Sequence, residues 1–363
     1  MQFPIPAFEQ QDTVFQRAFG ILNDAVAARS FPGASVAVTC QGRVVALKAL
    51  GRFTYEPDSP QVTPDTMFDL ASVSKVIATT SMAMVLYEGG FLDLDMPVVA
   101  AAPEFGGDDA RRQEITIRML LCHSSGLPAY EELFLRARTP NELLAAAFSV
   151  PLAADPGTVA VYSDIGFIVL GVVLARLADE RLDEFCHRHL PMLGMPDTLF
   201  NPPARCRASI PPTQDDRSFR NRIIQGEVQD ENASVLGGVA GHAGLFGPAR
   251  DVANFAQAML SGGRPLIRPE TLALFTRRQF TSEGTWALGW DTPSQPSQSG
   301  KYFSPRSFGH LGYTGTSLWI DPERQLSVTL LTNRTWPDCK NQAIKQVRPK
   351  FHDAIVEALQ HEK

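Results

Sequence analysis

The segment Ser72-Val-Ser-Lys75 places a hydroxyl and an amine three residues apart. Because residues i and i+3 share one face of a helix, Lys75 would reach the Ser72 hydroxyl there. A serine needs a neighbouring base to become a nucleophile, and a partly desolvated lysine can serve as that base. The competing interpretation is a capping serine followed by an exposed lysine. Lys75 is the only lysine between residues 49 and 300 and lies among small and apolar residues, which favours the catalytic interpretation.

A second segment, Tyr162-Ser163-Asp164, precedes an apolar stretch from Ile165 to Ala175. Ser163 or Asp164 would cap the helix that this stretch predicts. That capping role leaves Tyr162 free to point into a site. A phenol beside an ammonium group can pass protons between a nucleophile and a leaving group.

A third segment, Gly309-His-Leu-Gly-Tyr-Thr-Gly315, leads directly into a predicted strand. Closely spaced glycines at the start of a strand indicate that a ligand approaches the backbone there. A backbone N–H in this segment could supply half of an oxyanion hole.

Hydrophobic periodicity predicts the elements that hold these three segments. Apolar residues recur at helical spacing in the first 30 residues, and β-type runs occur near both chain ends. The predicted elements are strands at 34–40 and 43–50, strands at 317–320 and 326–332, and a final helix from about Asn341 to Glu357. Between Ser72 and about Leu274 the pattern is mostly helical.

These elements predict an α+β fold, in which an antiparallel sheet is built from both chain ends and flanked by helices. A mostly helical region would be inserted between the strands. The expected division is 1–66 with 280–363 for the sheet domain and 67–279 for the helical domain. The cleft between the two parts is the natural place for a site.

Composition narrows the class of protein. The chain has 363 residues, a net charge of −6 and 44% hydrophobic residues, which is ordinary for a globular protein and argues against a nucleic-acid partner. No apolar run approaches the roughly 20 residues of a membrane span, and no signal-peptide pattern is visible, so we expect a cytoplasmic location. The five cysteines are dispersed and show no metal-ligand spacing, so we expect no metal and no cofactor.

The ordered set of Ser-x-x-Lys, Tyr-Ser-Asp and His-x-Gly resembles the serine β-lactamase and penicillin-binding protein superfamily. The resemblance is strongest to the branch of class C β-lactamases, DD-peptidases, D-aminopeptidases and related esterases. It extends over nearly the whole chain, through the stretches that begin at Phe31, Leu121 and Gly237. It implies a β-lactamase/transpeptidase-like fold.

The resemblance also implies a role for each residue. Ser72 would be acylated, and Lys75 and Tyr162 would activate it and relay protons. The backbone N–H groups of Ser72 and Tyr313 would hold the oxyanion. Substrate would be bound by four further residues: Asp164, His310, Gly312 and Thr314. The reaction would be a two-step acyl transfer on a small-molecule or peptide substrate, without a metal.

Two residues depart from the β-lactamase pattern. Asp164 stands where that pattern has Asn, and an ionised carboxylate can only accept hydrogen bonds. His310 stands where it has Lys, and a neutral imidazole supplies no charge for a substrate carboxylate. Both changes weaken the case for efficient β-lactam hydrolysis. Asp164 would instead favour a substrate amine, or pair with His310 or Lys75.

Three functions therefore stay open. The first is hydrolysis of peptides that contain D-amino acids, such as peptidoglycan fragments, in the manner of a D-Ala-D-Ala carboxypeptidase. The second is a carboxylesterase, lactonase or weak β-lactamase activity, and the third is an inactive binding protein of the same fold.

A further stretch from Gly226 resembles a subgroup of peptidoglycan carboxypeptidases. Its Asp230 and Asn232, with His242, are better explained as loop scaffolding than as catalytic groups. The sequence does not indicate an oligomeric state.

Overall fold

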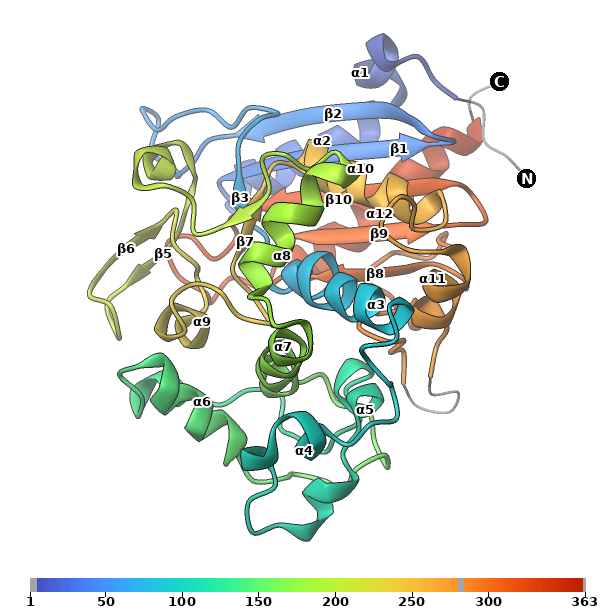
Figure 1. The fold of residues 1–363 in the computed structure, drawn as a ribbon. Helices are drawn as coiled ribbons and strands as arrows, with labels where there is room; N and C mark the ends of the chain where they lie inside the picture. Colours follow the sequence, from blue (N-terminus) through green and yellow to red (C-terminus); the bar gives the residue numbers. More distant parts are fainter. Residues whose placement is uncertain (1–4, 280–283, 362–363) are drawn as a thin grey trace.

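The computed structural model describes residues 5–279 and 284–361 (Figure 1). Its main sheet has five antiparallel strands in the order β2-β1-β10-β9-β8. The strands are β1 Gly33–Cys40, β2 Arg43–Gly51, β8 Phe308–Leu311, β9 Ser317–Asp321 and β10 Leu326–Thr332. The two chain ends meet where β1 pairs with β10, from Ala34 opposite Thr332 to Cys40 opposite Leu326. The predicted sheet built from both ends is confirmed.

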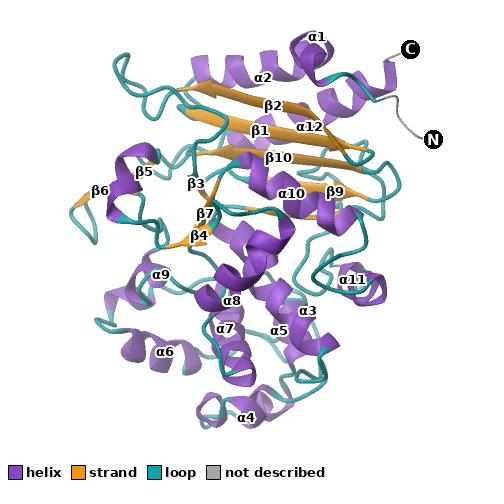
Figure 2. Ribbon diagram, turned by 45° about the horizontal axis from the view of Figure 1, so that its top comes forward, coloured by secondary structure: helices purple, strands orange, loops and turns teal. Residues whose placement is uncertain are grey.

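Helices cover both faces of this sheet (Figure 2). The terminal helices α2, Gln16–Ala27, and α12, Ile344–His361, pack against each other and share one apolar core with the strands. Helix α10, Ala249–Leu260, contacts β1, β9 and β10 and belongs to the second apolar core on the opposite face. The alternation of strand side chains between two apolar layers therefore holds the sheet in place.

The last helix begins at Ile344, three residues later than the sequence predicts. The preceding turn is held by Asn341, whose Oδ1 accepts from Ala343 N at 2.9 Å and whose carbonyl accepts from Arg334 Nη1 at 3.0 Å. A side chain that binds the backbone nearby competes with helix formation at that point.

Helices dominate the region between the terminal strands, as predicted, but its described residues also form five short strands. Strands β3 Phe68–Asp69, β7 Leu245–Gly247 and β4 Leu199–Phe200 form one small sheet, and β5 Pro212–Asp216 pairs with β6 Arg222–Gln225. The remaining helices are α1 Gln11–Val14, α3 Ser81–Glu88, α4 Val98–Ala101, α5 Ile117–Leu121, α6 Pro140–Phe148, α7 Asp164–Ala178, α8 Leu182–His189, α9 Glu231–Val235 and α11 Pro269–Thr276.

Helix α7 is the central element of this region (Figure 1). It contacts α3, α4, α5 and α6, and most of its side chains are buried, which explains its apolar sequence. Ser163 caps it, because the Ser163 hydroxyl accepts from Gly166 N at 3.0 Å. The start of α7 therefore holds Tyr162 and Asp164 at a fixed place beside the sheet.

The division into 1–66 with 280–363 and 67–279 stays a prediction, and its limits at 1, 280 and 363 fall outside the described residues. Within the described ranges, none of the helices combines the length and apolarity that a bilayer crossing requires. Over the same ranges, no three His, Cys, Asp or Glu side chains are grouped as metal ligands would be.

Candidate active site

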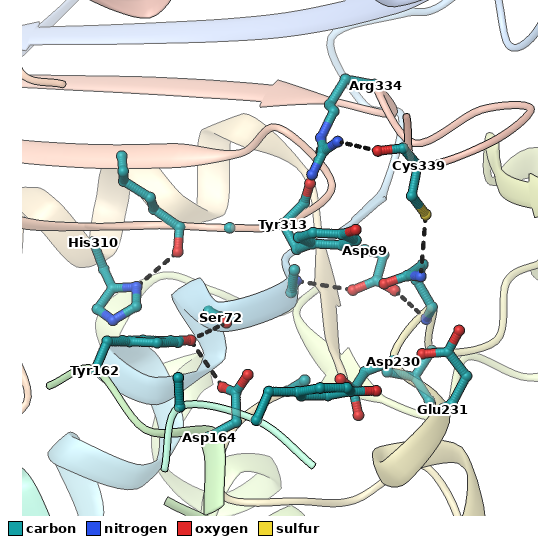
Figure 3. A pocket seen from close by; sticks show the side chains of 18 of the residues that line it. Asp69, Ser72, Tyr162, Asp164, Asp230, Glu231, His310, Tyr313, Arg334 and Cys339 are labelled. Atoms are coloured by element: carbon teal, nitrogen blue, oxygen red, sulfur yellow. Dashed lines mark hydrogen bonds between the residues drawn. The ribbon is translucent and has the colours of Figure 1, made fainter. Parts of the chain in front are cut away.

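A cavity of about 730 Å³ lies between the β8 edge of the main sheet and the loops that lead into α7 and α9 (Figure 3). Its wall includes most of the residues predicted from sequence: Ser72, Tyr162, Asp164, His310, Gly312 and Tyr313. Lys75 is fully buried behind this wall. The fold therefore brings the three motifs together from distant parts of the chain.

Thr314 has a different position from the one expected of a substrate ligand. It is fully buried, and its hydroxyl donates to the carbonyl of Asp69 at 2.9 Å. Thr316 does the same to the carbonyl of Leu70, at 3.1 Å. These threonines fasten the β8–β9 turn to the backbone that precedes Ser72, so we do not propose Thr314 as a substrate contact.

The backbone that presents Ser72 is strained. Ala71 has a φ of 47°, in the left-handed region that non-glycine residues avoid. The carboxylate of Asp69 holds this conformation, since its Oδ1 accepts from Ala71 N at 2.8 Å. A 3₁₀ turn over Ala71–Val73 then leads into a π-helical turn over Lys75–Thr80 and on to α3. Ser72 consequently sits at the start of a helical segment, with its side chain at the cavity.

The amine of Lys75 has four oxygen atoms around it. They are Ser72 Oγ at 3.0 Å, Tyr162 OH at 2.7 Å, Asp164 Oδ1 at 2.6 Å and the carbonyl of His242 at 2.9 Å. An ammonium group has three N–H donors, so it cannot serve all four oxygens at once. A neutral amine has a lone pair that can accept the Ser72 proton. The geometry is therefore suited to proton transfer between Ser72 and Lys75.

The electrostatic environment favours Lys75 over Tyr162 as the base. Burial lowers the pKa of Lys75, and the carboxylate of Asp164 opposes that shift. Burial and the same carboxylate raise the pKa of Tyr162 well above its usual value. Tyr162 is therefore a neutral phenol at pH 7. It donates to Asp164 Oδ1 at 2.8 Å and lies 2.8 Å from Ser72 Oγ, between nucleophile and carboxylate (Figure 3).

A glycine-rich segment delivers the fourth oxygen atom to Lys75. Gly241 packs so closely on α7 that an added Cβ would lie 2.1 Å from the carbonyl oxygen of Phe167. The next residue, His242, turns its carbonyl toward Lys75 and its ring toward Asp230, with Nε2 and Oδ1 2.7 Å apart. The ionised carboxylate can only accept, so Nε2 carries the proton.

The residues around Asp230 include the scaffolding that the sequence predicts. Asp230 Oδ1 also accepts from Ala233 N at 2.7 Å and caps α9. Asn232 is fully buried, accepts from Phe134 N at 3.0 Å and donates to the carbonyl of Glu131 at 2.8 Å. Asn232 is thus a scaffold residue. Asp230 is one too, but it also lines the cavity.

Asp69 connects the nucleophile to the same loop. Its second oxygen, Oδ2, accepts from Gln229 N at 2.7 Å. Burial raises the pKa of Asp69 to about 6, although both backbone donors oppose that shift. One buried carboxylate therefore ties the strained Ala71 to the loop that carries Asp230.

His310 supplies no positive charge to the site. Its Nδ1 lies 2.7 Å from the carbonyl of Leu311, so Nδ1 carries the proton. Burial, together with the nearby charge of Lys75, lowers the pKa of His310 to about 3. The imidazole is therefore neutral at pH 7 and does not supply the positive charge that a lysine would supply at this position.

Several site residues were not identified from the sequence. The ring of Trp286 lies 5.6 Å from that of Tyr162 and 5.8 Å from that of His310, and it closes one wall. Nothing in its local sequence marks it. Arg334 and Arg348 line the far wall. Arg348 could have been noticed in the sequence, because it is a charged residue within a series of apolar residues at helical spacing. The apolar residues of this series are buried on α12: Ile344, Phe351, Ile355 and Leu359.

Comparisons with known proteins agree with this arrangement. The sequence profile of the Beta-lactamase family matches residues 19–348. The N-acetylmuramyl-L-alanine amidase of Bacillus subtilis (strain 168) is 33% identical over 345 residues, covering 85% of this chain and 78% of the amidase. A Salmonella agona (strain SL483) protein with the provisional name D-alanyl-D-alanine carboxypeptidase is 31% identical over 306 residues, covering 75% and 70%.

Solved structures share the fold. EstCE1, described as a hydrolase with promiscuous acyltransferase activity, has a TM-score of 0.78 at 24% identity, covering 95% of this chain and 99% of its own. The class C beta lactamase of Rhodobacter sphaeroides has a TM-score of 0.69 at 22% identity, covering 94% and 98%. The fold and the family expected from the motifs are thus confirmed. This chain belongs to the Beta-lactamase family, and it is a hydrolase of the serine β-lactamase and penicillin-binding protein superfamily.

Proposed function

We propose that the protein hydrolyses acyl compounds through a covalent acyl-enzyme on Ser72. The observation that carries this proposal is the position of Lys75 Nζ, 3.0 Å from Ser72 Oγ and 2.7 Å from Tyr162 OH. A buried amine with a lowered pKa beside a serine hydroxyl is the arrangement that activates such a nucleophile. The intact set also argues against an inactive binding protein, since a buried lysine is costly to keep.

The reaction would proceed in two steps. Ser72 Oγ forms a bond to the substrate carbonyl carbon while its proton passes to Lys75. The N–H groups of Ser72 and Tyr313 stabilise the oxyanion. Tyr162 gives its proton to the leaving group as the scissile C–N or C–O bond breaks, and Lys75 reprotonates Tyr162. Water then attacks the carbonyl carbon of the acyl-enzyme. Its proton passes through Tyr162 and Lys75 back to Ser72 Oγ, and the acid is released.

For the substrate we propose peptides that contain D-amino acids, such as peptidoglycan fragments. The name of the Salmonella agona relative supports a peptide that contains D-alanine, and the name of the Bacillus subtilis relative, an N-acetylmuramyl-L-alanine amidase, supports a peptidoglycan fragment. The cavity supports it as well, because acidic side chains line one wall and Arg334 lines another. Such a pocket suits a substrate with both amine and carboxylate groups. The cytoplasmic location stays a prediction, and it would fit the turnover of imported fragments.

A carboxylesterase is the second candidate. It is favoured by the neutral state of His310, which leaves the β8 edge without a fixed cation for a substrate carboxylate. Neutral esters do not need such a cation. The same Ser72, Lys75 and Tyr162 machinery would serve both substrates.

The test is the mass of the intact protein after treatment with a fluorophosphonate probe. We expect one adduct on the wild type and none on Ser72→Ala. Ser74→Ala is the matched control, because Ser74 is buried two residues away and its hydroxyl accepts from Leu245 N at 3.1 Å. A wild type that stays unmodified while folded contradicts the proposal. A panel of D-Ala peptides and p-nitrophenyl esters then separates the two substrate classes.

A further inference from the structure

Arg348 is a buried cation behind the β8–β9 turn. Its side chain comes from α12, and the residue is 4% exposed. Nη2 donates to the carbonyls of Gly312 and Thr316, each at 3.0 Å, and Nε donates to the carbonyl of Gly315 at 3.3 Å. Among the described residues, no carboxylate forms an ion pair with Arg348, and the causes of its pKa shift are burial and Arg334. The turn is therefore held by a positive charge that has no acidic partner.

A second guanidinium lies on the same turn. Arg334 is also 4% exposed, and its Nε donates to the carbonyl of Tyr313 at 2.6 Å. Its charged group lies 4.3 Å from the centre of the Tyr313 ring (Figure 3). Burial and the repulsion from Arg334 together lower the pKa of Arg348 to about 9. Two like charges are thus buried around one short turn, an arrangement that costs free energy unless the carbonyls offset it.

The first carbonyl that Arg348 binds has a special position. The Gly312 carbonyl and the Tyr313 N–H belong to the same peptide group, and this N–H is the proposed oxyanion donor. A charged donor on a carbonyl oxygen draws electron density from the attached nitrogen and makes the N–H a stronger donor. The effect acts in a site of low dielectric constant, where hydrogen bonds to a developing anion are strong.

The same peptide group is fixed in place. An added Cβ at Gly312 would lie 1.8 Å from Thr316 Oγ1 and 2.8 Å from the carbonyl of Leu70, so the backbone lies directly against the segment before Ser72. Gly315 N also donates to the Gly312 carbonyl, at 3.0 Å. Arg348 therefore acts on a peptide group whose orientation is already set.

We propose that Arg348 is a positioning residue that polarises the Gly312–Tyr313 peptide group and so strengthens the oxyanion hole from behind. This inference rests on the proposed acyl-enzyme function. It assigns Arg348 a role in catalysis without contact to the reacting atoms. It predicts an effect on the acylation rate for every substrate, including one that has no charge.

The test compares Arg348→Gln with Arg112→Gln on p-nitrophenyl acetate, a neutral ester. Arg112 is a matched control, because it is 3% exposed and, among the described residues, donates only to the backbone carbonyls of Phe105, Phe148 and Val150. It lies in the helical region and does not line the cavity. We expect Arg348→Gln to lower the acylation rate about tenfold with little change in KM. Arg112→Gln should lower Tm and leave the rate unchanged, and Arg348→Lys should recover part of the loss.

Infrared spectroscopy supplies a readout that a merely structural role would not move. In an acyl-enzyme made with a slowly hydrolysed, ¹³C-labelled ester, a strong oxyanion hole lowers the stretching frequency of the ester carbonyl. We expect the frequency to rise in Arg348→Gln and to stay at the wild-type value in Arg112→Gln. An unchanged frequency in Arg348→Gln overturns the inference even if the rate falls.

Two further outcomes are decisive. If the loss in Arg348→Gln is confined to substrates with a carboxylate and appears in KM, Arg348 binds substrate and the inference is wrong. If the wild type is not acylated by any ester or fluorophosphonate, the proposed function fails, and the inference fails with it. An acylated wild type whose rate and spectrum are unaffected by Arg348→Gln overturns the inference alone.

Discussion

The Nζ atom of Lys75 lies 2.6 Å from Oδ1 of Asp164, and the same carboxylate oxygen accepts from the phenol of Tyr162 at 2.8 Å. The lysine of this pair is fully buried, and the carboxylate is largely buried. In the related β-lactamase pattern an uncharged Asn stands at this position. The pairing explains how a buried lysine keeps part of its proton affinity, because the carboxylate opposes the loss caused by burial.

Asp164→Asn should shift the pH dependence of acylation to lower pH. The Asp164 carboxylate raises the pKa of Lys75 relative to burial alone, so its removal lowers that pKa. A neutral Lys75 is the active base, and the acid limb of kcat/KM should therefore move down by about one pH unit. The measurement is the pH–rate profile on a neutral ester. An acid limb that stays in place or moves upward would show that Lys75 is not the base.

Tyr162→Phe tests the proton relay to the leaving group. The ring can stay in place, since it packs against His123 and Trp286 with centroids 4.9 and 5.6 Å away. We expect kcat to fall by about 10²-fold or more for an alkyl ester or peptide, whose leaving group needs a proton. The loss should be much smaller for p-nitrophenyl esters, whose leaving group departs as an anion. Equal losses on both kinds of substrate would assign Tyr162 a different role.

The sequence predicts this site in part. Ser72, Lys75 and Tyr162 stand in short motifs, and the main sheet follows from the hydrophobic pattern of the terminal strands. The three residues and the sheet could therefore be predicted from short segments of the sequence. Trp286 and Arg348 could not be assigned to the site, because the contacts that bring them there join segments far apart in the chain. Thr314 shows the opposite case. Its motif places Thr314 beside the site, but its hydroxyl donates to the carbonyl of Asp69 and so holds the turn in place.

Asp69→Asn should weaken both the fold and the presentation of Ser72. The carboxylate accepts from Ala71 N and Gln229 N, whereas an amide has only one oxygen and turns a donor toward the other N–H. We expect a loss of about 1–3 kcal/mol in the free energy of unfolding and a lower kcat. The control is Asn232→Asp, which also exchanges an amide and a carboxylate at a buried position close to the cavity wall. It should lower Tm but change kcat less than Asp69→Asn does.

The pH dependence of Asp69 has a defined sign. Its pKa in the folded protein is about 6, above the value near 4 of an unfolded chain. The proton is therefore bound more tightly in the folded state, and the resulting stability is present below pH 4 and is lost as pH rises through about 6. Unfolding measured from pH 4 to pH 7 should show this component in the wild type. If Asp69→Asn retains the whole slope, another group causes it.

Gly241→Ala tests whether the backbone approach to α7 positions the base. The added methyl group would lie 2.1 Å from the carbonyl oxygen of Phe167, so the segment must move away from the helix. That movement takes the neighbouring His242 carbonyl away from Lys75. It should lower both kcat and the free energy of unfolding, the latter by about 1–3 kcal/mol.

The matched control is Gly20→Ala in α2, where an added Cβ meets nothing within 4 Å. It should raise Tm slightly, because alanine favours a helix by up to about 1 kcal/mol, and it should leave kcat unchanged. A Gly241→Ala variant with wild-type kcat would mean that Lys75 does not need the His242 carbonyl.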